Sequence, residues 1–133
     1  MNLKKIDLIK WFEAGCKPKN LFRIGTEHAK FVYKLNSLKP VSYNEPSGIK
    51  NILKSLVRFG WVEVNEVGNL IALRKDNQSI TLEPGGQLEL SGAPLENVHQ
   101  VCEESSNFLK EIQLASKGLD LNTVSIGFDP FNN

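Results

Sequence analysis

The spacing of hydrophobic positions predicts three helices, one at each end of the chain's first half and one in its C-terminal third. In these segments apolar residues recur every three or four positions, which is the spacing of one helix face. We expect helices over residues 3–14, 46–60 and 95–117, each ended by a glycine. The predicted apolar stripes are Leu3, Ile6, Ile9 and Phe12; Ile49, Ile52, Leu53, Leu56 and Val57; and Leu95, Val98, Cys102, Ser105, Leu109 and Ile112.

Alternating apolar and polar positions, together with aromatic and β-branched residues, predict strands between the helices. We expect a long strand over 21–33, two short strands over 61–65 and 70–74 joined at Gly68-Asn69, two more within 79–94, and a last strand over 121–128. Strands joined by hairpins pair antiparallel. The pattern therefore predicts an α+β fold, a mostly antiparallel sheet with two to three packed helices and at least one unpaired sheet edge.

Length and composition indicate one globular domain, residues 1–133. The chain is 41% hydrophobic and 23% charged, and its net charge of +1 offers no broad positive surface for nucleic acid or an anionic membrane. Its first residues lack the apolar core of a signal peptide, and no stretch has the length of a membrane span. The two cysteines, Cys16 and Cys102, match no metal or redox spacing, so we expect a reduced, cytoplasmic setting.

Acidic residues around a glycine pair are the main candidates for chemistry. Glu83 and Glu89 flank Gly85-Gly86 and Gln87, and Glu27 lies on the first predicted strand. Glycine lets backbone pass close to a ligand, and converging carboxylates favour a hard cation such as Mg²⁺ with a phosphorylated ligand. The parity of the spacing does not fix how Glu83 and Glu89 face each other. The alternative is a surface turn with solvated acids.

Other polar residues have ordinary structural interpretations. His28 is interpreted as a core or interface histidine rather than a catalytic one, and His99 as structural. Cys102 falls on a predicted buried stripe, so we expect a small core hydrophobe rather than a nucleophile. Arg23 and Lys30 have the charge to bind an anion, although single basic residues on strands are usually solvated.

Four segments resemble a known family. The chain is similar to the plant and alphaproteobacterial type of glutamate-cysteine ligase (gamma-glutamylcysteine synthetase), and it resembles only the N-terminal part of that family's catalytic domain. The segments that carry the resemblance are residues 23–31 (RIGTEHAKF), 82–95 (LEPGGQLELSGAPL), 96–102 (ENVHQVC) and 126–130 (IGFDP).

The resemblance implies a fold like that of glutamine synthetase and a reaction that joins the γ-carboxylate of glutamate to the amine of cysteine. That reaction uses ATP and Mg²⁺, passes through a γ-glutamyl phosphate and begins glutathione synthesis. By position, Glu27, Glu83 and Glu89 correspond to metal ligands, and Gly85, Gly86 and Gln87 to groups that contact substrate. The family has a second glutamate where this chain has Ala29.

Two functions follow from the resemblance. The first is a ligase fragment that becomes active when a second chain completes the domain. The second is a catalytically inactive relic or repurposed binding module, which Ala29 favours. A standalone ligase is disfavoured, because a half-domain of 133 residues does not easily enclose three substrates.

Overall fold

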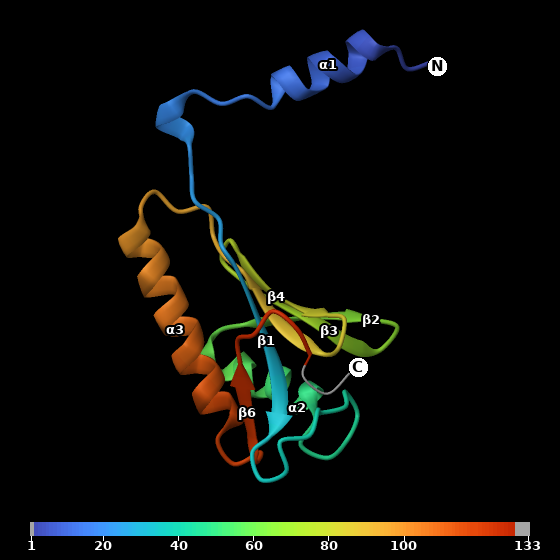
Figure 1. Ribbon diagram of the computed structural model, residues 1–133, viewed down its shortest axis with the longest axis vertical. Helices are drawn as coiled ribbons and strands as arrows, with labels where there is room; N and C mark the ends of the chain where they lie inside the picture. Colours follow the sequence, from blue (N-terminus) through green and yellow to red (C-terminus); the bar gives the residue numbers. More distant parts are fainter. Residues whose placement is uncertain (1, 130–133) are drawn as a thin grey trace.

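In residues 2–129, the part of the chain described by the computed structural model, six antiparallel strands form one sheet (Figure 1). The strands are ordered β2-β3-β4-β5-β1-β6 across the sheet. The elements are α1 (Lys5–Ala14), β1 (Glu27–Lys34), α2 (Ile49–Leu56), β2 (Val62–Glu66), β3 (Asn69–Lys75), β4 (Gln78–Glu83), β5 (Gln87–Ser91), α3 (Val98–Ser116) and β6 (Leu121–Val124), with short 3-10 turns at Lys19–Leu21 and Val57–Phe59. The predicted α+β class and antiparallel sheet are confirmed.

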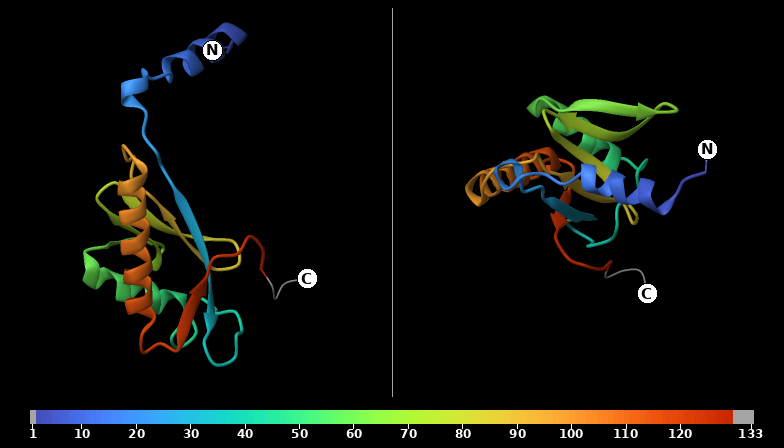
Figure 2. Two further views of the ribbon diagram at one scale, coloured as in Figure 1. Left: turned by 60° about the vertical axis from the view of Figure 1, so that its left-hand side comes forward. Right: turned by 90° about the horizontal axis from the view of Figure 1, so that it is seen from above.

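Helices α2 and α3 cover the same face of the sheet (Figure 2), and the hydrophobic core lies between them and the strands. Alternation along each strand sends every second side chain into this core. On β5, for example, Leu88 and Leu90 are fully buried. The core residues are Val32, Val41, Ile49, Ile52, Leu53, Leu56, Trp61, Leu70, Leu73, Ile80, Leu88, Leu90, Phe108, Ile112, Ala115 and Leu121.

The predicted stripe of α2 and the predicted hairpin are confirmed. Four residues of the stripe are buried, and only Val57, which lies beyond the α-helix, is 38% exposed. Gly60 ends this segment with a φ of 91°, a left-handed conformation that suits glycine. Strands β2 and β3 are joined at Val67 and Gly68, whose φ values of 47° and 78° fit the twist of a tight hairpin.

The predicted long strand begins later than expected, at Glu27 rather than at residue 21. Residues before Glu27 lie beyond the end of the partner strand, because β5 ends at Ser91. Ile24 forms an isolated bridge there with Leu95, made by two backbone hydrogen bonds of 2.7 and 2.9 Å. Likewise β6 is shorter than predicted and ends at Val124.

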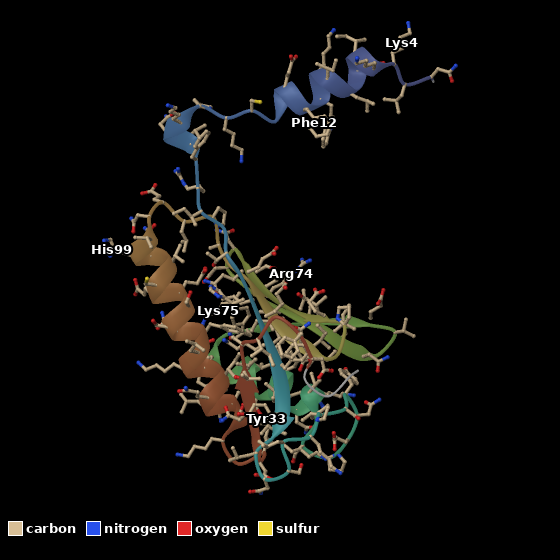
Figure 3. The ribbon with its side chains drawn as sticks, in the orientation of Figure 1. Lys4, Phe12, Tyr33, Arg74, Lys75 and His99 are labelled. Carbon is tan, nitrogen blue, oxygen red and sulfur yellow. The ribbon has the colours of Figure 1, made fainter. Side chains whose placement is uncertain are left out.

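The first predicted helix forms as α1, but none of its residues is buried. The helix is separate from the sheet in Figure 1 and in the left view of Figure 2. Phe12, labelled in Figure 3, lies far from the core. Within residues 2–129, α2 and α3 are therefore the predicted helices that pack against the sheet. No helix in residues 2–129 has the length and apolar character to cross a membrane.

The buried stripe of α3 differs from the predicted one. Val98 and Leu109 are 59% and 42% exposed, and Cys102 is exposed too, so its interpretation as a core residue is wrong. Ile112 of the predicted stripe is buried as expected, and the other buried residues of the helix are Glu104, Phe108, Ala115 and Ser116. A buried glutamate is tolerated because its carboxylate accepts hydrogen bonds from the Ala93 N–H (2.8 Å) and from the Thr26 hydroxyl (3.4 Å).

Candidate functional site

The strand register brings the three candidate glutamates to one face of the sheet. Residues directly opposite each other on antiparallel strands share a face, as do residues two apart on one strand. Glu89 lies opposite Ala29 on β1 and opposite Thr81 on β4. Glu27 is two residues from Ala29, and Glu83 is two residues from Thr81. The relative facing that sequence parity left open is thus settled, because all three glutamates lie on the same face.

This face is the one that α2 and α3 leave uncovered. The neighbours of Glu89 along β5, Leu88 and Leu90, are in the core, so Glu89 points to the opposite side. Glu83 and Glu89 are partly buried, while Glu27 is exposed. The acidic face therefore remains open to a ligand.

The electrostatic environment of Glu89 is unfavourable for a negative charge. Partial burial raises the pKa of its carboxyl above the ordinary value of 4.5, and the negative charges of Glu83 and Glu27 raise the pKa further. The ion pairs in the described residues are Arg23–Glu96, Lys34–Glu45 and Lys75–Glu111, and none of them involves the three glutamates. Within residues 2–129 no lysine or arginine pairs with this acidic face, so a cation bound there would relieve the repulsion.

The raised pKa of Glu89 predicts a pH-dependent stability. A carboxyl whose pKa is higher in the folded state stabilises the fold most below pH 4.5, and this contribution is lost as the pH rises through the folded pKa. We therefore expect Glu89→Gln to be more stable than the unmodified chain at pH 7, with the difference shrinking as the pH falls through the folded pKa of Glu89 towards 4.5. Urea unfolding across this range measures it. Glu66→Gln, an exposed site at the edge strand β2, is the control. A Glu89→Gln difference that does not change with pH would contradict the prediction.

The donor set fits a hard divalent cation in its chemistry, although it is not a complete ligand shell. In the described residues no three His, Cys, Asp or Glu side chains are close enough to hold one ion by themselves. Mg²⁺ in phosphate-transferring sites is usually bound by one or two carboxylates, with waters and substrate phosphates completing the octahedron. Glutamates spread over one face suit that arrangement, and their assignment as metal ligands stays a prediction.

The glycine pair forms the turn between β4 and β5. Gly85 and Gly86 have φ values of 80° and 75°, and the Gly86 N–H donates to the Glu83 carbonyl at 3.0 Å. A Cβ at Gly86 would lie 2.6 Å from Ile49 Cδ1, so glycine allows the turn to pack against α2. The Gln87 side-chain amide donates to the Pro84 carbonyl at 3.2 Å and closes the turn. The predicted contacts of Gly85, Gly86 and Gln87 with substrate stay a prediction.

His28 and Lys30 lie on the helix-covered face, away from the glutamates. His28 Nε2 is 2.9 Å from the Ser105 hydroxyl on α3, which fits its interpretation as a core histidine. Lys30 is buried, its ammonium donates to the Ser125 hydroxyl at 2.6 Å, and burial lowers its pKa. Neither residue is placed to compensate the acidic face.

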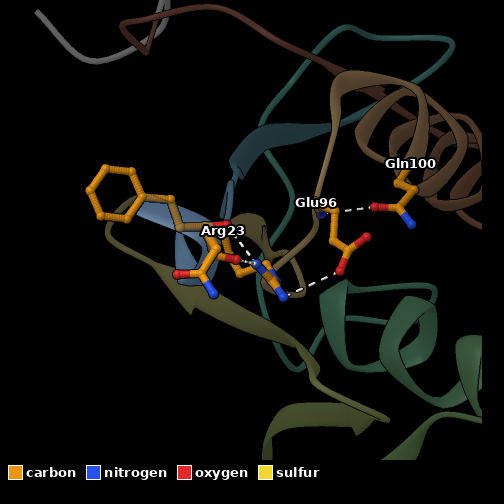
Figure 4. Close-up of polar contacts among 5 residues, drawn as sticks. Arg23, Glu96 and Gln100 are labelled. Carbon is orange, nitrogen blue, oxygen red and sulfur yellow. Dashed lines mark hydrogen bonds and ion pairs between the residues drawn. The ribbon is translucent and has the colours of Figure 1, made fainter. Parts of the chain in front are cut away.

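Arg23 fixes the segment before β1 instead of binding a free anion. Its guanidinium pairs with Glu96 at 3.2 Å and donates to the carbonyls of Asn20 and Phe22 at 3.2 and 2.8 Å (Figure 4). The Glu96 N–H in turn donates to the side-chain oxygen of Gln100 at 2.8 Å. These contacts tie the start of the chain to the linker that leads into α3.

Glu104, which the sequence pattern did not predict, holds the backbone next to the acidic face. Its carboxylate accepts from Ala93 and Thr26, and the Gly92 N–H donates to the Thr26 carbonyl at 2.7 Å. Thr26 directly precedes Glu27, so Glu104 helps to fix where β1 begins. The sequence did contain a signal for Glu104, namely an acidic residue on a face of the helix that is mostly apolar.

A cavity of about 340 Å³ lies on the other side of the sheet, beside α3. Three of the polar side chains that line it, those of Trp61, Lys75 and Glu111, bind one another. Glu111 accepts from the indole N–H of Trp61 at 2.6 Å and from the ammonium of Lys75 at 2.8 Å. This cavity is separate from the acidic face and does not extend the candidate site.

Comparison with known proteins gives one consistent result. Residues 23–133 match the family model described as glutamate-cysteine ligase family 2. The chain is 44% identical over 129 residues to the chloroplastic glutamate-cysteine ligase A of Oryza sativa subsp. japonica, a match that covers 96% of this chain and 26% of that protein. It is 45% and 42% identical over 128 residues to the chloroplastic glutamate-cysteine ligases of Medicago truncatula and Arabidopsis thaliana, again over 96% of this chain and 25% and 24% of those proteins. The chain thus spans about a quarter of the length of these relatives.

Proposed function

Because the chain belongs to glutamate-cysteine ligase family 2, we propose that it forms the N-terminal part of the catalytic domain of a ligase that joins L-glutamate to L-cysteine with ATP, the first step of glutathione biosynthesis. The observation that supports this most is the placement of Glu27, Glu83 and Glu89 on one uncovered face of the sheet without a basic partner among residues 2–129. We further infer that the sheet is part of a fold like that of glutamine synthetase.

In this proposal the glutamates hold the metal that accompanies ATP. When bound, Mg²⁺ supplies neutralisation and orientation of the phosphate charge, which is most of what phosphoryl transfer requires. Glu27, Glu83 and Glu89 contribute carboxylate oxygens from three different strands. We propose that the backbone of Gly85 and Gly86 and the amide of Gln87 contact substrate at the turn between β4 and β5.

The remainder of the domain supplies what these residues do not. We propose that basic groups that hold the nucleotide phosphates, and the walls that enclose glutamate and cysteine, are supplied by protein that corresponds to the part of the relatives outside the match. That part is carried either by the same polypeptide or by a second chain. We also propose a reducing, cytoplasmic setting, since Cys16 and Cys102 are exposed and unpaired, although the relatives are named chloroplastic.

A chimera tests the proposed activity. In it, residues 1–133 replace the matching quarter of rice glutamate-cysteine ligase A, and formation of γ-glutamylcysteine is measured with Mg²⁺, ATP, glutamate and cysteine. We expect the chimera to be active and the isolated chain to be inactive. A folded chimera that forms no product would reject the proposal. This holds whether or not calorimetry shows that the chimera binds Mg-ATP and glutamate.

The alternative function is an inactive relic or a repurposed binding module, and Ala29 favours it. Ala29 lies directly opposite Glu89, at the position where the family resemblance implies a further glutamate. A carboxylate fewer on this face weakens metal binding. The chimera distinguishes the two functions, because a relic would fold without supporting turnover.

Ala29→Glu is expected to strengthen Mg²⁺ binding by the assembled enzyme about 10 to 100-fold, the range typical of a lost or gained supporting ligand. The added carboxylate would extend from the same face, beside Glu89 and Glu27. Calorimetric titration of the chimera with Mg²⁺ measures the effect. The matched control is Ala72→Glu, which lies on the same face but is separated from β5 by β4. Equal affinities in the two variants would show that position 29 does not face the ions.

A further inference from the structure

Helix α1 exposes apolar side chains all around its axis. Successive residues are about 100° apart on a helix, so Ile6 and Leu8 point to nearly opposite sides. Trp11 and Phe12 are 72% and 70% exposed, and their rings contact each other edge to face at 5.2 Å. Charged residues (Lys5, Asp7, Lys10 and Glu13) lie between these apolar ones, so α1 has no single apolar face and differs from an amphipathic helix on a surface.

The helix has little to stabilise it in isolation. With 10 residues it is shorter than the roughly 12 to 15 residues at which isolated helices become even marginally stable in water. One cap is present, in which the Lys4 N–H donates to the Asp7 carboxylate at 2.9 Å, and no basic residue lies in the last turn. Packing against other protein is the remaining source of stability.

The segment that joins α1 to β1, residues 15–26, continues the apolar surface. Leu21 and Phe22 are 50% and 60% exposed, and a hollow of about 530 Å³ lies beside Trp11, Phe12, Ala14, Gly15 and Cys16. The base of this connecting arm is fixed to the body by the Ile24–Leu95 bridge and the Arg23–Glu96 ion pair. The arm is thus attached to the body at its base, while α1 extends away from the sheet (Figures 1 and 2).

We propose that α1 and the connecting arm dock into the remainder of the ligase, enclosed by the part that this chain does not span; the inference rests on the proposed function. Matches to the plant ligases cover 96% of this chain, so those proteins contain a counterpart of α1 together with most of their length outside the match. That additional protein is large enough to surround a helix. A membrane surface buries one side of a helix only, which leaves opposite apolar sides of α1 unsatisfied.

Hydrogen exchange in the isolated chain and in the rice chimera tests the docking. We expect the amides of α1 to exchange rapidly in the isolated chain and at least about 100-fold more slowly in the chimera, as for a segment that joins the cooperative core. Trypsin cleavage after Lys10 and Lys19, both exposed here, should slow in parallel. If the chimera does not fold, the same measurement on the aligned segment of intact rice ligase A decides the question, and rapid exchange there overturns the proposal.

Variants at the apolar surface complete the experiment. Trp11→Lys combined with Phe12→Lys should return α1 exchange in the chimera to the rate of the isolated chain. The control is Val67→Lys, at a 95% exposed apolar site in the β2–β3 turn, and it should leave the exchange rate of the α1 amides unchanged. If the amides of α1 exchange slowly in the isolated chain and light scattering shows a dimer, the proposal is overturned, because a second copy of the chain then covers α1. Binding of the isolated chain to phosphatidylglycerol vesicles through α1 would overturn it in favour of a membrane. A protected α1 in an inactive chimera would reject the proposed activity and leave the docking intact.

Discussion

Replacement of Phe108 by alanine is expected to lower the free energy of unfolding by about 3–5 kcal/mol. Phe108 on α3 is 3% exposed and belongs to the core between the helices and the sheet. Its removal loses the transfer free energy of the ring and leaves a cavity that α2 and the strands cannot fully close. The expected loss is a large part of the stability of a small domain. Urea unfolding of the isolated chain, followed by circular dichroism, measures it.

The neighbouring residue on the same helix provides the matched control. Leu109 is 42% exposed, so Leu109→Ala is expected to change the free energy of unfolding by no more than about 0.5–1 kcal/mol. Spacing along the sequence assigns Leu109 to the core, whereas the structure assigns Phe108. Comparable losses in the two variants, or a larger loss for Leu109→Ala, would show that α3 packs with a different face.

The combined substitution of Glu27 and Glu89 by glutamine is expected to reduce ligase activity of the rice chimera at least about 100-fold, since removing carboxylates that bind a catalytic metal costs no less than removing their supporting partners. The Mg²⁺ concentration for half-maximal activity should rise. The free energy of unfolding should not fall, because both side chains lie on the uncovered face and the negative charge of Glu89 is disfavoured by its acidic neighbours. Steady-state rates at several Mg²⁺ concentrations, together with thermal unfolding, measure the two effects.

Glu66→Gln is the control for this pair, because Glu66 is an exposed acid at the far edge strand β2. It should leave both the rate and the Mg²⁺ dependence unchanged. If the double variant kept its full rate and the same Mg²⁺ requirement, these glutamates would not be metal ligands, even though they share a face.

Local patterns were sufficient for α2, the β2–β3 hairpin and the overall class. In those elements the helix stripe and the turn glycine are determined by neighbours in the sequence. The stripe of α3 was not predictable in this way, because its true face includes Glu104. Periodicity rejects a face that contains a carboxylate, while the hydrogen bonds from Ala93 and Thr26 that make Glu104 acceptable come from distant parts of the chain.

The candidate glutamates were found from the sequence, but their shared face was not. Facing across a turn depends on which residues pair, and the pairs Ala29–Glu89 and Thr81–Glu89 are set by the sheet as a whole. The start of β1 was missed for a related reason, since residues before Glu27 have strand-like composition but almost no partner strand.

The alternation on β5 has a consequence for how this surface changes over time. Shifting the strand by one residue would turn Leu88 and Leu90 outward and Glu89 into the core, so burial of the two leucines helps to keep the acids in place. Conversely, an outward position such as 29 tolerates substitution at little thermodynamic cost. The acidic surface can therefore erode, or be rebuilt by single substitutions, while the architecture beneath it persists.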